Sequence, residues 1–364
     1  MKKFWVFSVV LLVLAVLAVV VPCLRAGETK GSRYQVLAPI RNGNLTIFPV
    51  VSDTSHDTSQ FLTLDEGLKS GDVIVTEAGS AAPLIRPRHG RQGWQEHPQA
   101  GNAEVNKLVL INNSKRPLLL LAGEIVTGGK QDRIIGKDRL VPAESDPVDL
   151  SVFCVEPGRW TGASSKFGAP AAIVQPSVRA KAMADKDQQK VWNEVATARN
   201  SLAVQAGSVA ETVTVEANSS YATVVDNSAV KKQIDTVAVP VQQEYQSVIR
   251  QLRERHAVGV VVAVNGQLIW SDVFASTSLL EKYWPKLVRS YAAETFSQPG
   301  KSNTVTVAGA QQFLDHLDGR REIIESEPGL FRHSETTGDG YEVFALMSLL
   351  PNTGFDLHLA KMVE

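Results

Sequence analysis

The residues best suited to chemistry lie in one segment, LLLLAGEIVTGGKQDRIIGKDR, at positions 118–139. Glu124 follows an apolar run, where partial burial would raise its pKa towards the range of a general base. Two adjacent glycines then precede a lysine and an arginine, so backbone N–H groups could approach an anion while the arginine offers a planar fork for phosphate or carboxylate. We therefore predict a site for an anionic ligand, with Glu124 as the catalytic base. The predicted ligand-binding residues of this segment are Lys130, Gln131, Asp132 and Arg133.

A second signature, CVEPGRW at residues 154–160, again ends an apolar strand in charged and aromatic residues. Glu156 and Arg159 would join the first group if the two strands are neighbours, and Trp160 would offer a wall for a ring. We predict that all three bind the ligand. The alternative is that Arg159 stacks on Trp160 and only holds the turn in place. Cys154 alternates with apolar residues of its strand, which favours burial over a role as a nucleophile.

The charges of residues 130–139 also have a purely structural interpretation. A run of opposite charges is typical of a solvated hairpin, whose surface ion pairs contribute little to stability. The glycine spacing, and the residue type that follows Lys130, exclude the Walker A pattern, so no nucleotide-binding loop of that kind is predicted.

Another group of polar residues lies in the loop RPRHGRQGWQEH at residues 86–97. Its potential metal ligands, His89, Glu96 and His97, have no recognised ligand spacing, so we predict no metal site. Its arginines are better suited to attracting an anion towards the first segment. The sequence identifies no cofactor.

The two signatures resemble those of a known family. The segments LLLLAGEIVTGGKQDRIIGKDRLVPA and VDLSVFCVEPGRW are similar to the family called the ARG and Rhodanese-Phosphatase-superfamily-associated protein domain. NKLVLINNS and WSDVFASTSLLEKYWPKLVRSYA extend the resemblance over most of the chain. The activity of that family is uncharacterised. Its name records genomic association with ADP-ribosylglycohydrolase and rhodanese-phosphatase proteins, so the resemblance implies a link to NAD or ADP-ribose metabolism.

The first 26 residues have the layout of an export signal. A basic start precedes an uncharged apolar run at residues 4–21 and a short region of small residues, as in a secretory signal peptide. The run also reaches the roughly 18–20 residues of a spanning helix, so an uncleaved signal-anchor is the alternative. Either form places residues 27–364 outside the cytoplasm, in the periplasm or the medium, because Lys2 and Lys3 stay inside. Contact with a membrane is expected only through this segment.

The composition is that of a folded protein. Of 364 residues, 44% are hydrophobic and 21% are charged, as in globular domains. Lys and Arg number 37 against 38 Asp and Glu. The sequence has no clustered basic face of the kind that nucleic acid requires, so nucleic-acid binding is not expected. Cys154 is the only cysteine after the export segment, which excludes an internal disulfide.

The elements that position these residues are predicted from local patterns. Residues 27–170 form a β-rich part that carries both signatures, and residues 171–257 form a helical segment with a loose connection rich in Ala, Ser and Thr. Residues 258–364 form a C-terminal α/β part packed on the first, as one domain. Turn signals at Asn42-Gly43 and Asn265-Gly266 predict two hairpins. The expected fold class is α+β, with a β-rich N-terminal sheet or sandwich.

Three helices are expected. One starts near Pro176, because proline is favoured in the first turn. A second covers residues 230–256 and is interrupted at Pro240. The third is an aromatic helix over residues 278–296, and residues 201–228 form the loose connection.

Taken together, these features predict an exported protein that binds a small anionic or phosphorylated ligand at the loops 123–133 and 156–160. It could be an enzyme of NAD or ADP-ribose metabolism. The alternative is a non-catalytic binding or interaction domain of the cell envelope, with the same charges as a structural network. Protein partners and oligomeric state are not predicted. A concave site that gathers Glu124, Arg133, Glu156 and Arg159 would favour ligand binding over a structural role.

Overall fold

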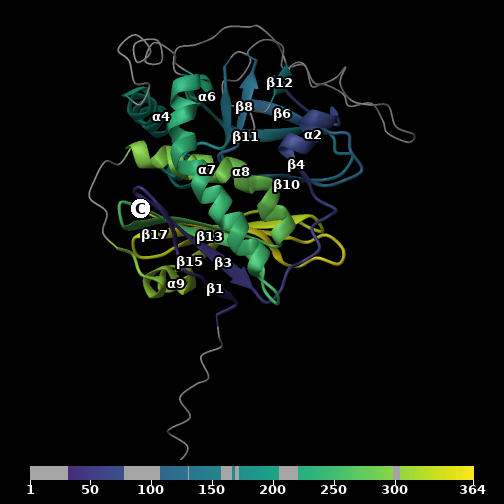
Figure 1. Ribbon diagram of the computed structural model, residues 1–364. Helices are drawn as coiled ribbons and strands as arrows, with labels where there is room; N and C mark the ends of the chain where they lie inside the picture. Colours follow the sequence, from purple (N-terminus) through teal and green to yellow (C-terminus); the bar gives the residue numbers. More distant parts are fainter. Residues whose placement is uncertain are drawn as a thin grey trace, which may run out of the picture. The chain divides into compact units, whose positions relative to one another are not determined.

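The computed structural model describes residues 32–77, 107–129, 131–156, 166–168, 172–204, 220–297 and 304–364 (Figure 1). Of these, Tyr34–Glu364 form one compact unit. This unit combines antiparallel sheets with helices, which confirms the predicted α+β class. Outside the described residues lie the export segment, the loop 86–97, Lys130, Arg159 and Trp160.

Strands from both ends of the chain form the largest sheet. Within the described ranges it has nine strands, each antiparallel to its neighbours. In order across the sheet they are β1 (Tyr34–Val36), β3 (Leu45–Ser52), β13 (His256–Val264), β14 (Gln267–Phe274), β18 (Asp356–Val363), β17 (Tyr341–Ser348), β16 (Phe331–Thr337) and β15 (Arg320–Glu327), with β2 (Ile40–Asn42) paired to β3.

Both predicted hairpins are confirmed in this sheet. Gly43, between β2 and β3, has a φ of 57°. Asn265 and Gly266, between β13 and β14, have φ values of 53° and 75°. In the second hairpin, positive φ at both central residues is what a two-residue turn of type I′ requires, and Asn and Gly tolerate it best.

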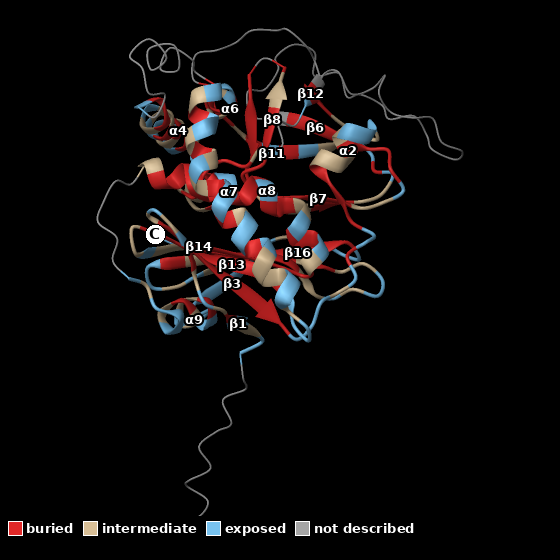
Figure 2. Ribbon diagram, viewed as in Figure 1, coloured by how far each residue is buried: buried red, intermediate tan, exposed pale blue. Residues whose placement is uncertain are grey.

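Both faces of the large sheet are buried. Successive residues of a strand point to opposite faces. In β13, Val260 packs in the core shared with α7 (Ser228–Gln251) and α8 (Thr277–Ser297), whereas Val261 packs in the core beneath α9 (Val307–Asp315). Figure 2 shows these buried strands with α7 and α8 on one side and α9 on the other.

A second β-structure carries both signatures. Its strands close a barrel in the order β11 (Val148–Cys154), β6 (Lys107–Asn112), β5 (Val73–Glu77), β12 (Lys166–Gly168), β8 (Ile125–Gly128) and β9 (Arg133–Ile135). Beside it runs a small sheet in the order β10 (Arg139–Val141), β7 (Leu118–Leu120) and β4 (Leu62–Thr63). Helix α2 (Leu64–Ser70) follows β4 directly, and a capping box between Thr63 and Glu66 fixes its first turn.

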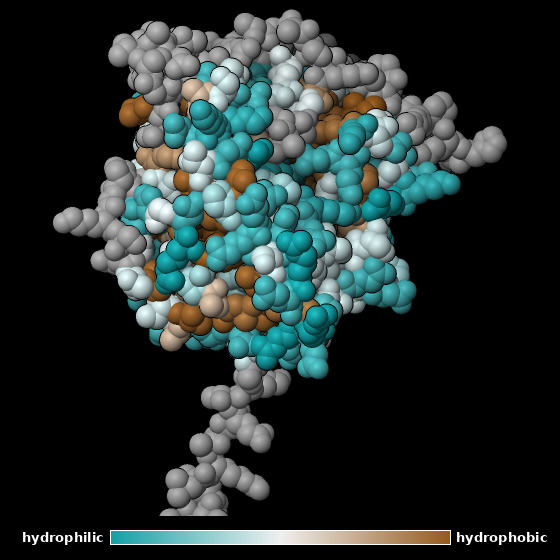
Figure 3. Space-filling view, in the orientation of Figure 1, coloured by the Kyte–Doolittle hydropathy of each residue, from teal (hydrophilic) through white to brown (hydrophobic). Residues whose placement is uncertain are grey.

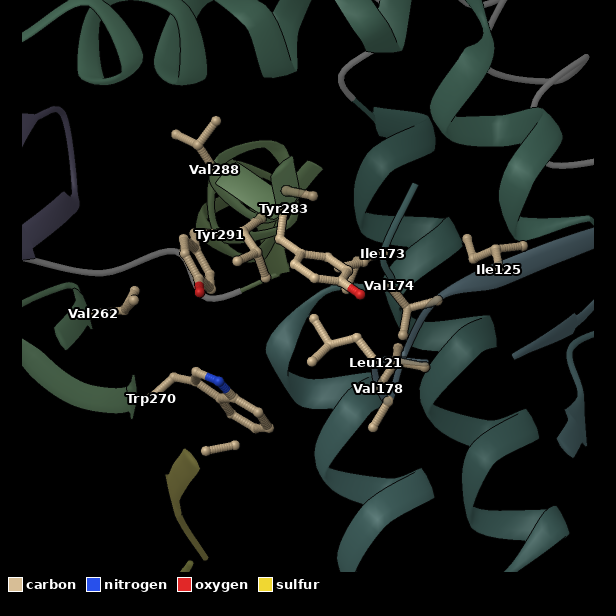
Figure 4. Close-up of a cluster of buried hydrophobic side chains, with 14 of the residues drawn as sticks. Leu121, Ile125, Ile173, Val174, Val178, Val262, Trp270, Tyr283, Val288 and Tyr291 are labelled. Carbon is tan, nitrogen blue, oxygen red and sulfur yellow. The ribbon is translucent and has the colours of Figure 1, made fainter. Parts of the chain in front are cut away.

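Helix α8 contacts both the large sheet and the strands of the small sheet. Figure 4 shows Tyr283 of α8 directed towards Leu121 and Val174, and Tyr291 above Trp270 of β14. The hydroxyl of Tyr283 donates a hydrogen bond to the carbonyl oxygen of Leu119 at 3.1 Å, so this buried aromatic ring keeps a partner for its polar end. These contacts bring the side of α8 up to the charged segment.

The expectation that Pro240 interrupts a helix is wrong, because α7 continues through it. Proline lacks the N–H that would bond to the carbonyl oxygen of Thr236 one turn earlier. The side-chain amide of Asn42 donates to that oxygen at 3.1 Å and replaces the missing bond. A residue about 190 positions away in the sequence therefore keeps the helix intact.

The remaining described helices precede α7. They are α3 (Pro176–Ala180), the π-helical η4 (Lys181–Asp185), α4 (Gln188–Ala203) and α6 (Tyr221–Asp226). The helix start near Pro176 is confirmed, whereas residues 221–226 are helical although a loose connection was expected there. Ser220 explains the difference, since its side chain caps α6 by accepting a hydrogen bond from the N–H of Thr223. Across the described part of the chain, no helix is long and apolar enough to cross a membrane.

Candidate functional site

The charges of residues 118–139 are largely buried. Glu124 is 1% exposed, and Arg133 and Asp138 are fully buried. The interpretation of this run as a solvated hairpin is therefore wrong for these residues. Only polar or charged partners make such burial tolerable, and the ionic partners of Glu124 and Asp138 come from distant parts of the chain.

Glu124 lies in a cluster with a lysine and a second carboxylate. Its Oε1 is 2.5 Å from Nζ of Lys286 in α8, and its Oε2 accepts a hydrogen bond from the N–H of Leu121 at 2.7 Å. Lys286 Nζ also contacts Asp65 Oδ2 at 2.7 Å, and Asp65 is held by the capped first turn of α2. One buried cation therefore serves two carboxylates.

This arrangement shifts the acidity of both central groups. Burial raises the pKa of Glu124 above its ordinary value, although the charge of Lys286 opposes the rise. Burial alone would lower the pKa of Lys286, but the charges of Glu124 and Asp65 outweigh it and raise that pKa. Lys286 thus stays protonated, and the pKa of Glu124 lies above its ordinary value.

The residues after the glycine turn form a separate group. Strands β9 and β11 are neighbours, with Arg133 opposite Cys154, and this pairing brings Glu156 to the turn. The N–H of Asp132 donates to Glu156 Oε2 at 2.8 Å, and a guanidinium nitrogen of Arg133 donates to the carbonyl oxygen of Gln131 at 2.6 Å. Gln131, Asp132, Arg133 and Glu156 therefore come together, whereas the carboxylate of Glu124, which was expected in the same group, binds Lys286 instead. Their assignment to a ligand stays a prediction, and Lys130, Arg159 and Trp160 lie outside the described residues.

The second turn of the charged segment leads into a buried ionic network. His358 of β18 places Nδ1 2.5 Å from Asp138 Oδ2 and Nε2 3.0 Å from Asp272 Oδ1. Arg179 of α3 donates to both oxygens of Asp272, at 2.9 and 3.1 Å, and the hydroxyl of Tyr291 also donates to Asp272. These residues are fully buried, and they join the charged segment to the large sheet.

Charge balance explains how the network tolerates burial. Burial alone would lower the pKa of His358, but the charge of Asp138 and the hydrogen bonds to Asp138 and Asp272 raise it to about 9. Burial would raise the pKa of Asp272, but the charge of Arg179 and the hydrogen bond from His358 hold it well below its usual range. At neutral pH two cations therefore face two carboxylates.

Lys286, Arg179, Asp272 and His358 were not predicted from the sequence. A usable signal did exist, because LIWSDVF and LHLA each place one charged or titratable residue in an apolar strand. Charged residues are almost never fully buried without a partner, so each marks a buried pair, although the pattern does not identify the partner.

A cavity of about 200 Å³ opens beside the Glu124 cluster, between α6, α7 and α8. The charged residues in its wall are Lys231, Lys286, Arg289, Asp226 and Asp235. Lys231 contacts Asp226 at 3.4 Å and Arg289 contacts Asp235 at 3.0 Å, and both pairs are partly exposed. Hydrophilic residues cover most of the face on which α7 lies (Figure 3).

Two other expectations concern Cys154 and metals. Cys154 is fully buried, as predicted, and burial raises the pKa of its thiol to about 11. A thiol in this state is a poor nucleophile. Among the described residues, no group of His, Cys, Asp and Glu is placed to hold a metal ion. His89, Glu96 and His97 lie outside them.

The comparisons with known proteins give one match. Residues 33–359 match the model of a family described as ARG and Rhodanese-Phosphatase-superfamily-associated Protein domain. No curated protein and no solved structure matches the chain.

Proposed function

The chain belongs to the ARG and Rhodanese-Phosphatase-superfamily-associated Protein domain family, and we propose that it is an exported protein that binds a small anionic or phosphorylated ligand beside Glu124. The observation that carries the proposal is that Lys286, the ion-pair partner of Glu124, also lines the cavity between α6, α7 and α8. A ligand in this cavity would contact Lys286, which separates it from the predicted catalytic base Glu124.

The cavity wall offers cations that an anion could bind. Lys231 and Arg289 each contact one carboxylate, and Lys286 is shared by Glu124 and Asp65. Surface ion pairs such as Lys231–Asp226 and Arg289–Asp235 contribute little to stability, so each cation can exchange its carboxylate for an anionic group of the ligand. Arg289 would bind a phosphate or carboxylate with two parallel hydrogen bonds.

The predicted ligand-binding loop is connected to this cavity through α6. Asp132 Oδ2 accepts a hydrogen bond from the hydroxyl of Ser220 at 2.6 Å, and the next residue, Tyr221, lines the cavity. The turn at residues 131–133 would therefore hold one wall of the site in place. Lys130, Arg159 and Trp160 remain proposed contacts to the ligand.

The chemistry proposed for Glu124 is proton transfer. A raised pKa makes the carboxylate of Glu124 a stronger base, and Lys286 would hold an anionic group of the ligand beside it. The family's association with ADP-ribosylglycohydrolase and rhodanese-phosphatase proteins favours ADP-ribose and related phosphorylated compounds. If the protein is an enzyme, Glu124→Gln should keep ligand binding and lose turnover, since the amide cannot accept a proton.

A thermal-shift screen with ADP-ribose, NAD, phosphorylated sugars, inorganic phosphate and small carboxylates tests the binding. A ligand at ~100 times its Kd adds about 2.7 kcal/mol to the free energy of unfolding. The double variant Lys231→Ala/Arg289→Ala should lose the shift. The control, Lys232→Ala/Arg250→Ala, removes two exposed cations of α7 outside the cavity and should keep it. No shift with any probe, or an equal shift in both double variants, would refute the proposed site and leave the charges a structural role.

Export is tested separately by cell fractionation and by the intact mass of the purified protein. We expect an extracytoplasmic protein that has lost its first 26 residues. An intact N-terminus in the membrane fraction would indicate the signal-anchor form with residues 4–21 in the bilayer, and an intact cytoplasmic protein would refute export.

A further inference from the structure

A second cavity, of about 250 Å³, lies beside the turn formed by Gly136 and Lys137. Its apolar wall includes Phe153 of β11, Met183 of η4 and Phe344 of β17. It shares no lining residue with the cavity beside Lys286. The two sites are therefore independent, and a ligand here would not touch the Glu124 cluster.

His333 of β16 lies in the wall of this second cavity. The side chain is 2% exposed, and neither ring nitrogen has a hydrogen-bond partner within the described ranges. Burial lowers the pKa of His333, although the charge of Asp138 opposes the change. The ring is therefore neutral at pH 7, with one N–H donor and one acceptor nitrogen. Buried polar groups nearly always have hydrogen-bond partners. A ligand that bonded to His333 would supply such a partner to one of its ring nitrogens.

The charges at this cavity are already matched. Lys137 Nζ is 2.6 Å from Glu325 Oε2, and Lys186 Nζ is 2.6 Å from Glu335 Oε2. Each cation has its own carboxylate and most of the wall is apolar, so the cavity suits an uncharged ligand better than an ion. The remaining attraction comes from apolar and aromatic surface together with the imidazole of His333.

We propose that this cavity binds an uncharged aromatic molecule with one hydroxyl or N–H group, of the size of a phenol or an indole, whose polar group hydrogen-bonds to His333. An apolar cavity of roughly 150 Å³ is enough for benzene, so the present volume accepts one ring system with a short substituent. Phe153 and Phe344 supply rings for offset or edge contacts, and the thioether of Met183 contacts aromatic rings favourably.

Titration of the purified full-length protein with phenol and with indole, followed by ligand-observed NMR, tests the proposal. We expect saturable binding of one ligand per chain. Ser151→Trp places a large ring at the mouth of the cavity, on an exposed strand position, and should weaken binding at least tenfold. The matched control is Asp149→Trp, at an exposed position on the same strand outside the cavity, which should leave binding unchanged.

The role of His333 has its own readout. His333→Leu removes the hydrogen bond and keeps the size of the side chain. It should weaken phenol binding about five- to tenfold and leave the binding of toluene unchanged. Absence of saturable binding to the unaltered protein, or equal affinities of the Ser151→Trp and Asp149→Trp variants, would overturn the proposal. An equal loss of affinity for phenol and for toluene in His333→Leu would overturn the assigned hydrogen bond. If His333→Leu fails to fold, the comparison of Ser151→Trp with Asp149→Trp still tests whether the cavity binds the ligand.

Discussion

The protonation of His358 should make the stability of the protein depend on pH in a defined window. Both ring nitrogens of His358 face carboxylates, those of Asp138 and Asp272. A neutral imidazole has only one N–H and could donate to only one of them. The folded protein therefore holds a proton on this ring more tightly than the unfolded chain does, which is why its pKa rises from 6.5 to about 9.

The sign and size of the effect follow from this difference. Because the folded pKa of His358 is raised, its contribution to the free energy of unfolding is fully present below pH 6.5 and is lost as the pH rises to about 9. At about 1.4 kcal/mol for each pH unit, the loss is on the order of 3 kcal/mol. Asp138 and Asp272 act at the other end, since their lowered pKa values give stability that is lost only as the pH falls below about 4.

Urea unfolding at several pH values between 6 and 9.5 measures this loss. We expect the native protein to be more stable than His358→Gln, which cannot carry the proton, at pH 6, and we expect this difference to shrink across the window. His256→Gln, at an exposed position, is the matched control and should follow the native curve. Lys361, whose pKa is lowered by burial to about 8, changes stability in the opposite direction in all three proteins, so it cancels in the difference. Parallel profiles for the native protein and His358→Gln would refute a charged His358.

Three further changes test other parts of the structure. Lys286→Met should lower the free energy of unfolding by about 3–5 kcal/mol, because it leaves Glu124 buried without a cation. The double variant Lys286→Met/Glu124→Gln should recover most of this loss, and no recovery would contradict the ion pair. Cys154, with a thiol pKa of about 11, should react with a disulfide-exchange reagent at pH 8 only after unfolding, and rapid reaction of the native protein would disprove its burial. Gly123→Ala should lower the melting temperature more than Gly43→Ala does. Both glycines have positive φ, but only the new methyl group at Gly123 meets another side chain, at 2.5 Å. Equal losses in the two variants would show that the packing around Gly123 relaxes freely.

Features that depend on neighbouring residues were predicted correctly from the sequence. The hairpin at Asn265-Gly266 follows from turn chemistry, and the strand predicted from VDLSVFCVE follows from alternation. Both form, the strand as β11 (Val148–Cys154), which ends two residues earlier than the alternating segment. The helix at residues 278–296 follows from its composition and appears as α8, one residue longer at each end. Each of these patterns lies within about twenty residues and acts through local backbone preferences.

Features that depend on distant residues were not predictable. Pro240 does not break its helix because Asn42 supplies the missing donor. The buried charges have the same origin, since the partner of Glu124 lies 162 residues away and that of Asp138 lies 220 residues away. The sequence of a charged segment does not show which other segment will cover it. The interpretation of residues 130–139 as a solvated hairpin was therefore reasonable, but it is wrong for the buried residues Arg133 and Asp138.

The position of the charges also explains why an apolar strand leads into them. After β7 the backbone turns at Ala122, where its N–H donates to Asp138 at 2.8 Å and its carbonyl oxygen accepts from Arg179 at 3.1 Å. A buried turn leaves peptide groups without ladder partners, and these charged side chains satisfy them. Separating these buried charges from their partners would cost several kcal/mol. The half-exposed Lys231 and Arg289 can change partners with little loss of free energy. We therefore propose that the ligand binds first to the exposed cations of the cavity and then contacts Lys286, the partner of Glu124.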